Sequence, residues 1–260
     1  MNEYEDKKIL ITGASKGLGL LVAEGYGAKG ARIFATARSA DLLKALVDGL
    51  QKQDQSEPDR HGFLAADLLD TDAVSTLADT VLSAMGTPDI IIHCMGGGYG
   101  FHDPLLAAEQ LDKLFGVNVK AGAEINRLLV PAMTENGGGY ILHVGSAAST
   151  QAIASTGYNT VKAALAAYVR SLGNELAAGN VIVTGILPGG FFAPDNSFRR
   201  MEADKPDVLQ KFIDERLPRG FMADGAEILP LIYFLTSPGA SMMAGSCIPI
   251  DAGESRAYAK

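Results

Sequence analysis

The sequence contains very little of what a disulfide framework or a metal centre requires. It has only two cysteines, Cys94 and Cys247, and its 260 residues are enough to bury a large core without covalent cross-links, so we expect both thiols to be reduced. The four histidines show none of the paired spacings that metal ligands have, and we predict that the chain holds no structural metal.

Positive charge and long apolar runs are also scarce. The chain has 22 Lys and Arg against 30 Asp and Glu, and this balance argues against a nucleic-acid partner because binding to phosphates needs clustered cations. No apolar run approaches the roughly 18 residues of a membrane span, and the acidic start lacks the basic and apolar stretches of a secretory signal. We therefore expect a cytoplasmic protein with no membrane partner.

The composition is instead that of one large α/β domain. Hydrophobic residues make up 47% of the chain, and strand-like apolar runs alternate with segments of helical period. The runs are residues 9–11, 33–37, 63–66, 90–94, 140–144, 181–187 and 246–250. This alternation predicts a doubly wound (Rossmann), mostly parallel sheet of about seven strands with helices on both faces, in a single domain of residues 1–260. Ligands of such sheets bind beyond the carboxyl ends of the strands.

The first apolar run leads directly into the sequence TGASKGLG, residues 12–19. Gly13 allows a sharp turn, Gly17 allows bare backbone to approach a pyrophosphate, and Gly19 allows the following helix to pack closely on the sheet. The N-terminus of that helix would then face the anion. Glycines at this spacing can also serve packing alone, so a dinucleotide site needs support from the rest of the chain.

Tyr158 and Lys162 stand four residues apart in YNTVK, at the start of a segment with strong helix propensity. They therefore share one face of the predicted helix. An ammonium beside a phenol favours the phenolate, so we predict that the pKa of Tyr158 lies below its usual value of about 10. By itself, such a pair is more typical of an exposed helix surface.

Taken together, these motifs resemble those of the short-chain dehydrogenase/reductase family, in its compact single-domain branch, over residues 8–253. TGASKGLG matches the family's TGxxxGxG and YNTVK its YxxxK, while Ser146 lies at the end of a predicted strand, where the family has its catalytic serine. Asn118 in VNVKAG matches the fourth catalytic member. The 3-oxoacyl-(acyl-carrier-protein) reductases are the nearest well-known relatives. The resemblance implies that Asn118, Ser146, Tyr158 and Lys162 are catalytic.

The mechanism that the resemblance implies is an interconversion of a ketone and a secondary alcohol. Tyr158 gives a proton to the carbonyl oxygen as a nicotinamide delivers hydride, and Ser146 donates a hydrogen bond to that oxygen. Lys162 holds the nicotinamide ribose and favours ionisation of Tyr158, and Asn118 anchors a water that links Lys162 to solvent. The alternative is a catalytically silent NADP(H)-binding sensor or scaffold, which would have no need of all four residues.

The resemblance also indicates which cofactor binds. Ala37 stands where relatives that prefer NAD carry an acidic residue, and Arg38 and Lys16 resemble the cations that bind a 2′-phosphate, so we expect NADP(H). Asp67 matches the acid that bonds the adenine amino group, with Leu68 against the ring, although Asp67 could equally cap a helix. The full set of expected cofactor-binding residues is Gly13, Ser15, Lys16, Gly17, Leu18, Gly19, Arg38, Asp67, Leu68, Cys94, Gly96, Asn118, Tyr158, Lys162, Pro188 and Gly189.

Three positions depart from the family pattern. The sequence HCMG, residues 93–96, replaces NNAG, so the turn is kept while the asparagine contacts are lost, and we interpret Cys94 and Met95 as packing residues beside the adenosine. Ala193-Pro194 stands where relatives often have a threonine that bonds the nicotinamide carboxamide, and Thr184 replaces a common asparagine.

The substrate side is less defined. Residues 190–224 interrupt the alternation, with a short helix predicted over 207–216, and we interpret them as a mobile lid, the alternative being a purely structural excursion. We expect the lid aromatics, with Tyr99 and Phe101, to surround the space above the nicotinamide; the lid aromatics are Phe191, Phe192 and Phe198. The sequence AAGN, residues 177–180, lacks the basic residue that favours a carrier-bound substrate, so a small ketone or alcohol is expected. Relatives commonly pair through the helix that holds Tyr158, which implies a homo-oligomer, a dimer or tetramer.

Overall fold

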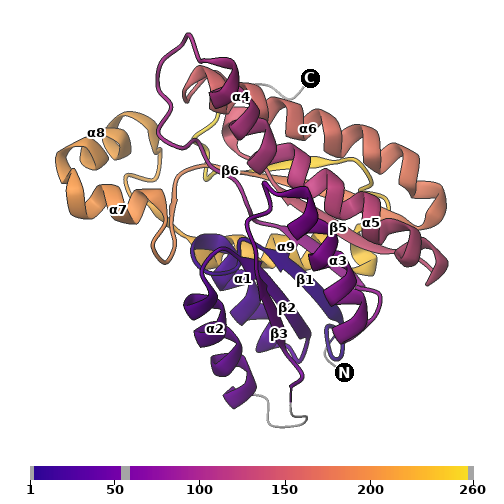
Figure 1. The fold of residues 1–260 in the computed structure, drawn as a ribbon. Coiled ribbons are helices and arrows are strands. Elements are labelled where there is room, and N and C mark those ends of the chain that lie inside the picture. The colour runs from indigo at the N-terminus through magenta and orange to yellow at the C-terminus, as the bar shows by residue number, and fades with distance from the viewer. Residues whose placement is uncertain (1–2, 54–58, 257–260) are drawn as a thin grey trace.

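A computed structural model describes residues 3–53 and 59–256 and contains a seven-stranded parallel sheet. The strand order is β3-β2-β1-β4-β5-β6-β9. The strands are β1 (Lys8–Thr12), β2 (Arg32–Ala37), β3 (Gly62–Ala65), β4 (Ile90–His93), β5 (Gly139–Val144), β6 (Val181–Pro188) and β9 (Cys247–Ile250). The α-helices are α1 (Gly17–Gly27), α2 (Ala40–Gln53), α3 (Thr71–Met85), α4 (Ala108–Phe115), α5 (Ala121–Glu135), α6 (Thr156–Leu176), α7 (Ser197–Asp204), α8 (Pro206–Arg216) and α9 (Leu229–Leu235). Helices cover both faces of the sheet, as Figure 1 shows, so the predicted fold class is confirmed.

The strand order places a topological switch point at the middle of the sheet. From β1 the chain moves outward through β2 to β3, and it then returns to β4, which pairs with the other side of β1. From β4 it proceeds in the opposite direction through β5 and β6 to β9. Ligands of open α/β sheets bind at such a reversal, beyond the carboxyl ends of the two strands. The turns that follow β1 and β4 are therefore the expected binding region.

The central strands are continuous apolar runs because both of their faces are buried. Ile9 and Ile11 of β1 pack in the cluster that contains α1 and α2, whereas Leu10 between them packs in the cluster of α3 and α5. All three side chains are fully buried. Alternation of side chains across a strand thus supplies two separate cores, and a polar residue on either face would be buried without water.

Residues 190–224, here called the inserted segment, leave the sheet after β6 and carry α7 and α8. The two ends of the segment pair as a short parallel sheet, β7 (Phe191–Phe192) with β8 (Ala223–Asp224). The helix predicted over 207–216 is confirmed as α8, which starts one residue earlier with a proline in its first turn. Strands of two residues carry no periodicity, so β7 and β8 could not be predicted.

The inserted segment has a small apolar cluster of its own. Leu209, Leu217 and Met222 are buried there, and Phe192 and Phe198 pack against them. The rings of these two phenylalanines contribute to the packing between α7, α8 and β7, because a segment that projects from the sheet must bury apolar area against itself. Both are only partly buried, and their place beside a substrate stays a prediction.

Candidate functional site

The glycine turn after β1 has the geometry of an anion cradle. A Cβ at Gly13 would lie 2.9 Å from Met95 N, and one at Gly19 would lie 2.3 Å from Gly13 O, so both positions accept only glycine. At Gly17, where φ is +61°, a Cβ would meet only Asn196 Cβ, at 4.0 Å. The N-terminus of α1 has no side-chain cap. A helix N-terminus without a side-chain cap suits the phosphates of a dinucleotide.

The inserted segment contacts this turn directly. Gly17 N donates a hydrogen bond to Pro194 O at 2.6 Å, and Lys16 Nζ lies 3.0 Å from Asp195 Oδ2. Arg200 Nη1 binds the same carboxylate at 3.1 Å, and hydrogen bonds from the two cations hold the pKa of Asp195 below its usual value. Lys16, which the resemblance implies as a phosphate ligand, therefore has a carboxylate partner in this structure.

The residues expected around the adenosine occupy two environments. Arg38 is exposed at the end of β2, whereas Leu68 is buried in the core on the α3 face. Asp67 Oδ1 accepts a hydrogen bond from Leu69 N at 3.1 Å, but the N-cap of α3 is Asp70, so the alternative of Asp67 as a helix cap is wrong. Burial raises the pKa of Tyr99, and the charges of Arg38 and Asp67 add smaller effects that lower and raise it, respectively. Tyr99 thus lies in their electrostatic environment.

Four side chains from three segments of the chain lie near one another at the carboxyl edge of β4 and β5. Lys162 Nζ of α6 donates to Val144 O of β5 at 3.0 Å and lies 5.6 Å from the centre of the Tyr158 ring. Ser146 follows β5 as the N-cap of a 3-10 turn, where its Oγ accepts from Ala148 N at 3.1 Å. The Ser146 hydroxyl also forms a hydrogen bond with the Tyr158 phenol.

Asn118 enters the site from a π-helical turn, Gly116–Lys120, that joins α4 to α5. Its Nδ2 donates to Leu114 O at 2.9 Å and to Gly97 O at 3.0 Å, and its Oδ1 accepts from Gly97 N at 3.1 Å. A Cβ at Gly96 would lie 2.8 Å from Asn118 Oδ1 and 3.1 Å from Lys162 Nζ. Gly96 therefore lies beside both the amide and the ammonium, with no room for a side chain. π-helical turns commonly occur at functional sites.

Burial decides the charge states of the cluster. It raises the pKa of Tyr158 above its usual value, and the Ser146 hydroxyl offsets only part of this rise, so our prediction of a lowered pKa is wrong for the protein alone. Burial also lowers the pKa of Lys162 to about 8, against an opposing effect of Cys94. The Cys94 thiol has its pKa raised to about 12 by burial, which keeps it protonated and suits a packing role.

A buried polar network lies beneath this cluster, and we did not predict it. His93 Nε2 of β4 is 2.9 Å from Asn126 Oδ1 of α5, whose Nδ2 is 3.2 Å from His143 Nε2 of β5 and donates to Tyr168 OH at 3.1 Å. The two imidazoles stack with centroids 4.4 Å apart. Burial lowers the pKa of His93 to about 4 and that of His143 well below its usual value, so both rings are neutral at pH 7.

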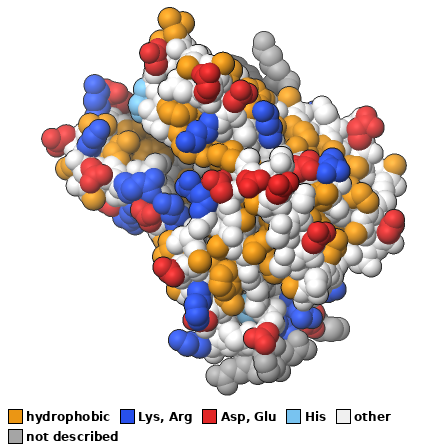
Figure 2. Space-filling view, in the orientation of Figure 1, with side chains coloured by type: hydrophobic (Ala, Val, Ile, Leu, Met, Phe, Trp, Pro, Cys, Tyr) orange, Lys and Arg blue, Asp and Glu red, His pale blue; other side chains and the backbone are white. Residues whose placement is uncertain are grey.

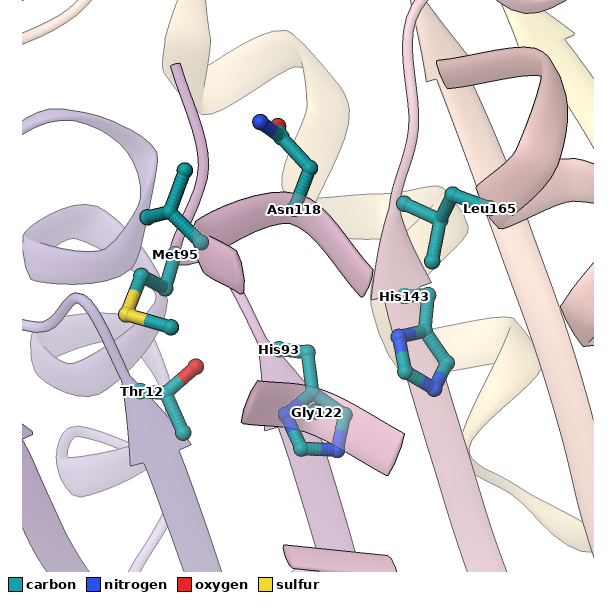
Figure 3. A pocket seen from close by; sticks show the side chains of 8 residues that line it. Thr12, His93, Met95, Asn118, Gly122, His143 and Leu165 are labelled. Carbon is teal, nitrogen blue, oxygen red and sulfur yellow. The ribbon is translucent and has the colours of Figure 1, made fainter. Parts of the chain in front are cut away.

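Figure 3 shows these rings side by side, with the Asn118 side chain pointing away from them. Beside the two rings lies a cavity of about 10 Å³, roughly the space of one water. It is lined by Thr12, His93, Met95, Val117, Asn118, Gly122, His143 and Leu165. Thr12 Oγ1 is buried with no hydrogen-bond partner among residues 3–53 and 59–256. The network therefore braces β4, β5, α5 and α6 directly below the catalytic candidates.

The remaining expected positions lie around the end of β6. Pro188 is the last residue of β6 and pairs with Ile250, and a Cβ at Gly189 would lie 2.6 Å from Glu254 Oε2. Ser15 is half-buried in the glycine turn, and Leu18 is buried in the core on the α1 face. Thr184 is fully buried in β6, far along the strand from the turn.

The surface and the described residues limit what else the site can hold. Figure 2 shows a hollow between the inserted segment and the body of the molecule, with Lys and Arg side chains along its rim near α7. No group of three or more His, Cys, Asp or Glu in the described part of the chain could hold a metal ion. In the same residues no helix is long and apolar enough to cross a bilayer.

Comparisons with known proteins agree with this geometry. The 7α-hydroxysteroid dehydrogenase of Escherichia coli is 29% identical over 253 residues, which cover 96% of this chain and 94% of that protein. A 3-oxoacyl-(acyl-carrier-protein) reductase of Pseudomonas aeruginosa is 26% identical over 253 residues, 96% of this chain and 97% of that protein.

Solved structures of dehydrogenases and reductases are also similar to this chain. The L-sorbose reductase of Gluconobacter frateurii, complexed with NADPH and L-sorbose, superposes with a TM-score of 0.90 at 29% identity, over 99% of this chain and all of that chain. A 7α-hydroxysteroid dehydrogenase complexed with NADH and 7-oxo glycochenodeoxycholic acid superposes with a TM-score of 0.87 at 26% identity, over 96% of this chain and 95% of the other.

The family model for short chain dehydrogenases matches residues 7–202. This match includes the glycine turn, Asn118, Ser146 and the Tyr158-Lys162 pair. Members of this family are oxidoreductases that bind a nicotinamide cofactor. The chain belongs to the short-chain dehydrogenase family.

Proposed function

We propose that this chain is an NADP(H)-dependent oxidoreductase that interconverts a ketone and a secondary alcohol, with Tyr158 as general acid and base. The observation that supports the proposal is the convergence of Asn118, Ser146, Tyr158 and Lys162 beside the switch point of the sheet. A sensor or scaffold would gain nothing from burying an ammonium beside a phenol, because burying either group carries a cost in free energy.

Each residue of the cluster has a chemical task in this proposal. A bound nicotinamide would supply or accept the hydride. The raised pKa of Tyr158 keeps its phenol protonated at neutral pH, so it can donate a proton to the carbonyl oxygen during reduction. The Ser146 hydroxyl would donate a hydrogen bond to the same oxygen. Lys162, with a pKa of about 8, is largely charged at pH 7 and can hold the ribose hydroxyls, while Asn118 anchors a water.

A preference for NADP(H) over NAD(H) is supported by the end of β2. Ala37 offers no carboxylate to repel a 2′-phosphate, and the exposed Arg38 follows it directly. The L-sorbose reductase complex contains NADPH, whereas the 7α-hydroxysteroid dehydrogenase complex contains NADH. Relatives of similar identity thus differ in cofactor, and in this chain the residues at the end of β2 are what supports binding of the additional phosphate.

The inserted segment would act as a lid over the hollow in Figure 2, within a single domain of residues 1–260. Subunits would pair through α6, whose exposed Ala163 and Ala167 allow a second helix to approach closely. A monomeric mass in solution would contradict this pairing. A cytoplasmic location is proposed with it, and fractionation of cells that produce the protein tests it.

The decisive experiment measures NADPH and NADH oxidation with a panel of ketones that includes L-sorbose and a 7-oxo bile acid. We expect Tyr158→Phe to keep NADPH binding and to lose at least about a hundredfold in turnover, because the proton donor is gone. Tyr168→Phe is the matched control, since it removes the same atom from the same helix at the buried network. Near-normal turnover in Tyr158→Phe would refute the mechanism. Tight NADPH binding without turnover of any ketone or alcohol would favour the silent sensor.

A further inference from the structure

A buried carboxylate near the C-terminal end of the described chain has no role in the mechanism above. The side chain of Glu254 is 4% exposed, although acidic side chains are rarely this buried unless they are paired. Its two oxygens bind different elements. Oε1 accepts a hydrogen bond from Arg216 Nη2 at 2.6 Å, and Oε2 accepts one from Gly190 N at 2.7 Å.

Arg216 extends the connection to a third element. It is the last residue of α8, and its Nη1 donates to Ile153 O at 3.1 Å. Ile153 lies in residues 150–155, which join the turn of Ser146 to the helix of Tyr158. One ion pair thus links α8, the backbone just after Pro188-Gly189, and the loop between two catalytic candidates.

The packing around the pair leaves little freedom. A Cβ at Gly190 would lie 2.9 Å from Phe212 Cε1, and the Arg216 guanidinium lies 5.2 Å from the centre of the same Phe212 ring. The chain beyond β9 is held in place as well, because Arg256 N donates to Gln151 Oε1 at 3.2 Å. Figure 1 shows α8 at the outer edge of the molecule, away from the central strands.

We propose that Glu254 and Arg216 are positioning residues that hold α8 and residues 150–155 at a fixed distance from the Gly190 turn, and so set the width of the substrate cleft. This inference rests on the proposed function for its consequence on a ketone substrate. The pair reaches the expected cofactor residues at one edge, through the Gly190 amide next to Gly189, but it does not contact Tyr158 or the glycine turn after β1. We therefore expect its loss to affect substrate affinity more than cofactor affinity.

The opposite charges of Glu254 and Arg216 allow single and double substitutions to be distinguished. Removing Arg216 leaves the buried carboxylate of Glu254 without a compensating charge, whereas removing both residues relieves that charge. Arg216 also uses its planar fork to reach Glu254 and Ile153 at once, and the single ammonium of a lysine cannot do so.

The experiment compares Glu254→Gln, Arg216→Met and the double variant with Glu202→Gln. Glu202 is the matched control because it lies in the neighbouring helix α7 and pairs with Arg199 at 2.8 Å. In contrast to Glu254, both side chains of that pair are about half exposed. For Glu254→Gln we expect KM for L-sorbose, or for the best ketone of the panel, to rise about tenfold with NADPH affinity within about twofold of wild type. The double variant should raise KM by no more than the single variant with the larger rise.

Amide hydrogen exchange of residues 206–216 gives a readout that needs no substrate. We expect faster exchange in α8 for Glu254→Gln and Arg216→Met, because these changes release the helix from the body of the molecule. Exchange in α8 should be unchanged in Glu202→Gln. If Glu254→Gln does not fold, Arg216→Lys is used in its place. We expect it to give smaller rises in KM and in the exchange rate of α8.

Unchanged exchange in α8 together with an unchanged KM would overturn the inference, and so would an equal loss of NADPH affinity and substrate affinity, which marks a general structural role. These outcomes are distinct from failure of the proposed function. If the wild-type protein reduces no ketone, the proposed function falls, while the exchange experiment still decides whether the pair holds α8.

Discussion

Replacing Gly96 by alanine tests whether Asn118 and Lys162 act as one unit. The new Cβ would lie 2.8 Å from Asn118 Oδ1 and 3.1 Å from Lys162 Nζ, and contacts under 3.0 Å force a shift. Neither group can withdraw freely. The Asn118 amide is held by hydrogen bonds to Leu114 and Gly97, and the Lys162 ammonium is held by Val144 O at 3.0 Å. The methyl group must therefore break one of these bonds or separate the two side chains.

The size of the effect follows from the bond that is lost. A hydrogen bond to a charged group contributes about 1.5–3 kcal/mol. Since about 1.4 kcal/mol corresponds to a tenfold change in rate, Gly96→Ala should lower kcat/KM by about ten- to a hundredfold. Gly49→Ala is the matched control, because a Cβ there meets no atom within 4 Å and the residue lies in α2. It should leave kcat/KM unchanged and stabilise the helix by up to about 1 kcal/mol.

The assay is NADPH oxidation with the best ketone of the panel, together with NADPH titration and thermal unfolding of both variants. If Gly96→Ala unfolds at the same temperature as the wild-type protein, its loss of rate comes from a change within the site and not from a loss of overall stability. A variant with wild-type kcat/KM and wild-type NADPH affinity would refute the reasoning, because it would show that turnover does not depend on the placement of Asn118 and Lys162 around Gly96.

Three further predictions concern charge. Lys162 loses its proton as pH rises through about 8, so affinity for NADPH, measured by titration, should fall between pH 7 and 9, and a flat profile would contradict a role in binding ribose. His93, with a pKa of about 4 in the folded state and about 6.5 when unfolded, binds more protons in the unfolded chain below pH 6.5. The free energy of unfolding should therefore fall by about 2 kcal/mol from pH 7 to 5 in urea titrations, with His143 acting in the same direction, and His93→Asn should lessen that fall. Arg38→Asp should lower NADPH affinity about tenfold or more relative to NADH, and a preference for NADPH that survives the change would contradict the assignment.

Most of the fold could be predicted because burial on both faces of a parallel sheet leaves a clear pattern. Runs such as Ile9-Leu10-Ile11 and Ile90-Ile91-Ile92 have no polar residue to interrupt them, since each side chain enters one of two cores. The glycine turn was predictable for a related reason. Gly13 and Gly19 lie against backbone atoms, and no other residue type fits there.

The polar network of His93, Asn126, His143 and Tyr168 could not be predicted, because its members come from four separate elements. Only the replacement of NNAG by HCMG signalled that something differs at His93, and its partners have no fixed spacing from it. A buried histidine needs partners for its ring nitrogens, and the topology alone decides which side chains supply them.

The sign of the Tyr158 pKa shift was wrong for an energetic reason. Proximity of an ammonium was expected to dominate, but the phenol and the ammonium are both buried, and burial disfavours the charged form of each. The spacing of Tyr158 and Lys162 specifies that they share a helix face. It carries no information on how much water the surrounding elements exclude, and that exclusion sets the direction of both shifts.

The same comparison of magnitudes decides whether the ion pair of Lys16 with Asp195 conflicts with a phosphate site at the glycine turn. Both side chains are about half exposed, and exposed pairs contribute only about 0.2–1 kcal/mol. A phosphate oxygen offers Lys16 a stronger, charge-assisted bond, and Asp195 keeps Arg200 as a partner when Lys16 leaves. A dinucleotide can therefore take Lys16 from the inserted segment at little cost. Gly17 N also donates to Pro194 O, so the turn that would bind the cofactor is attached at two points to the segment that carries α7.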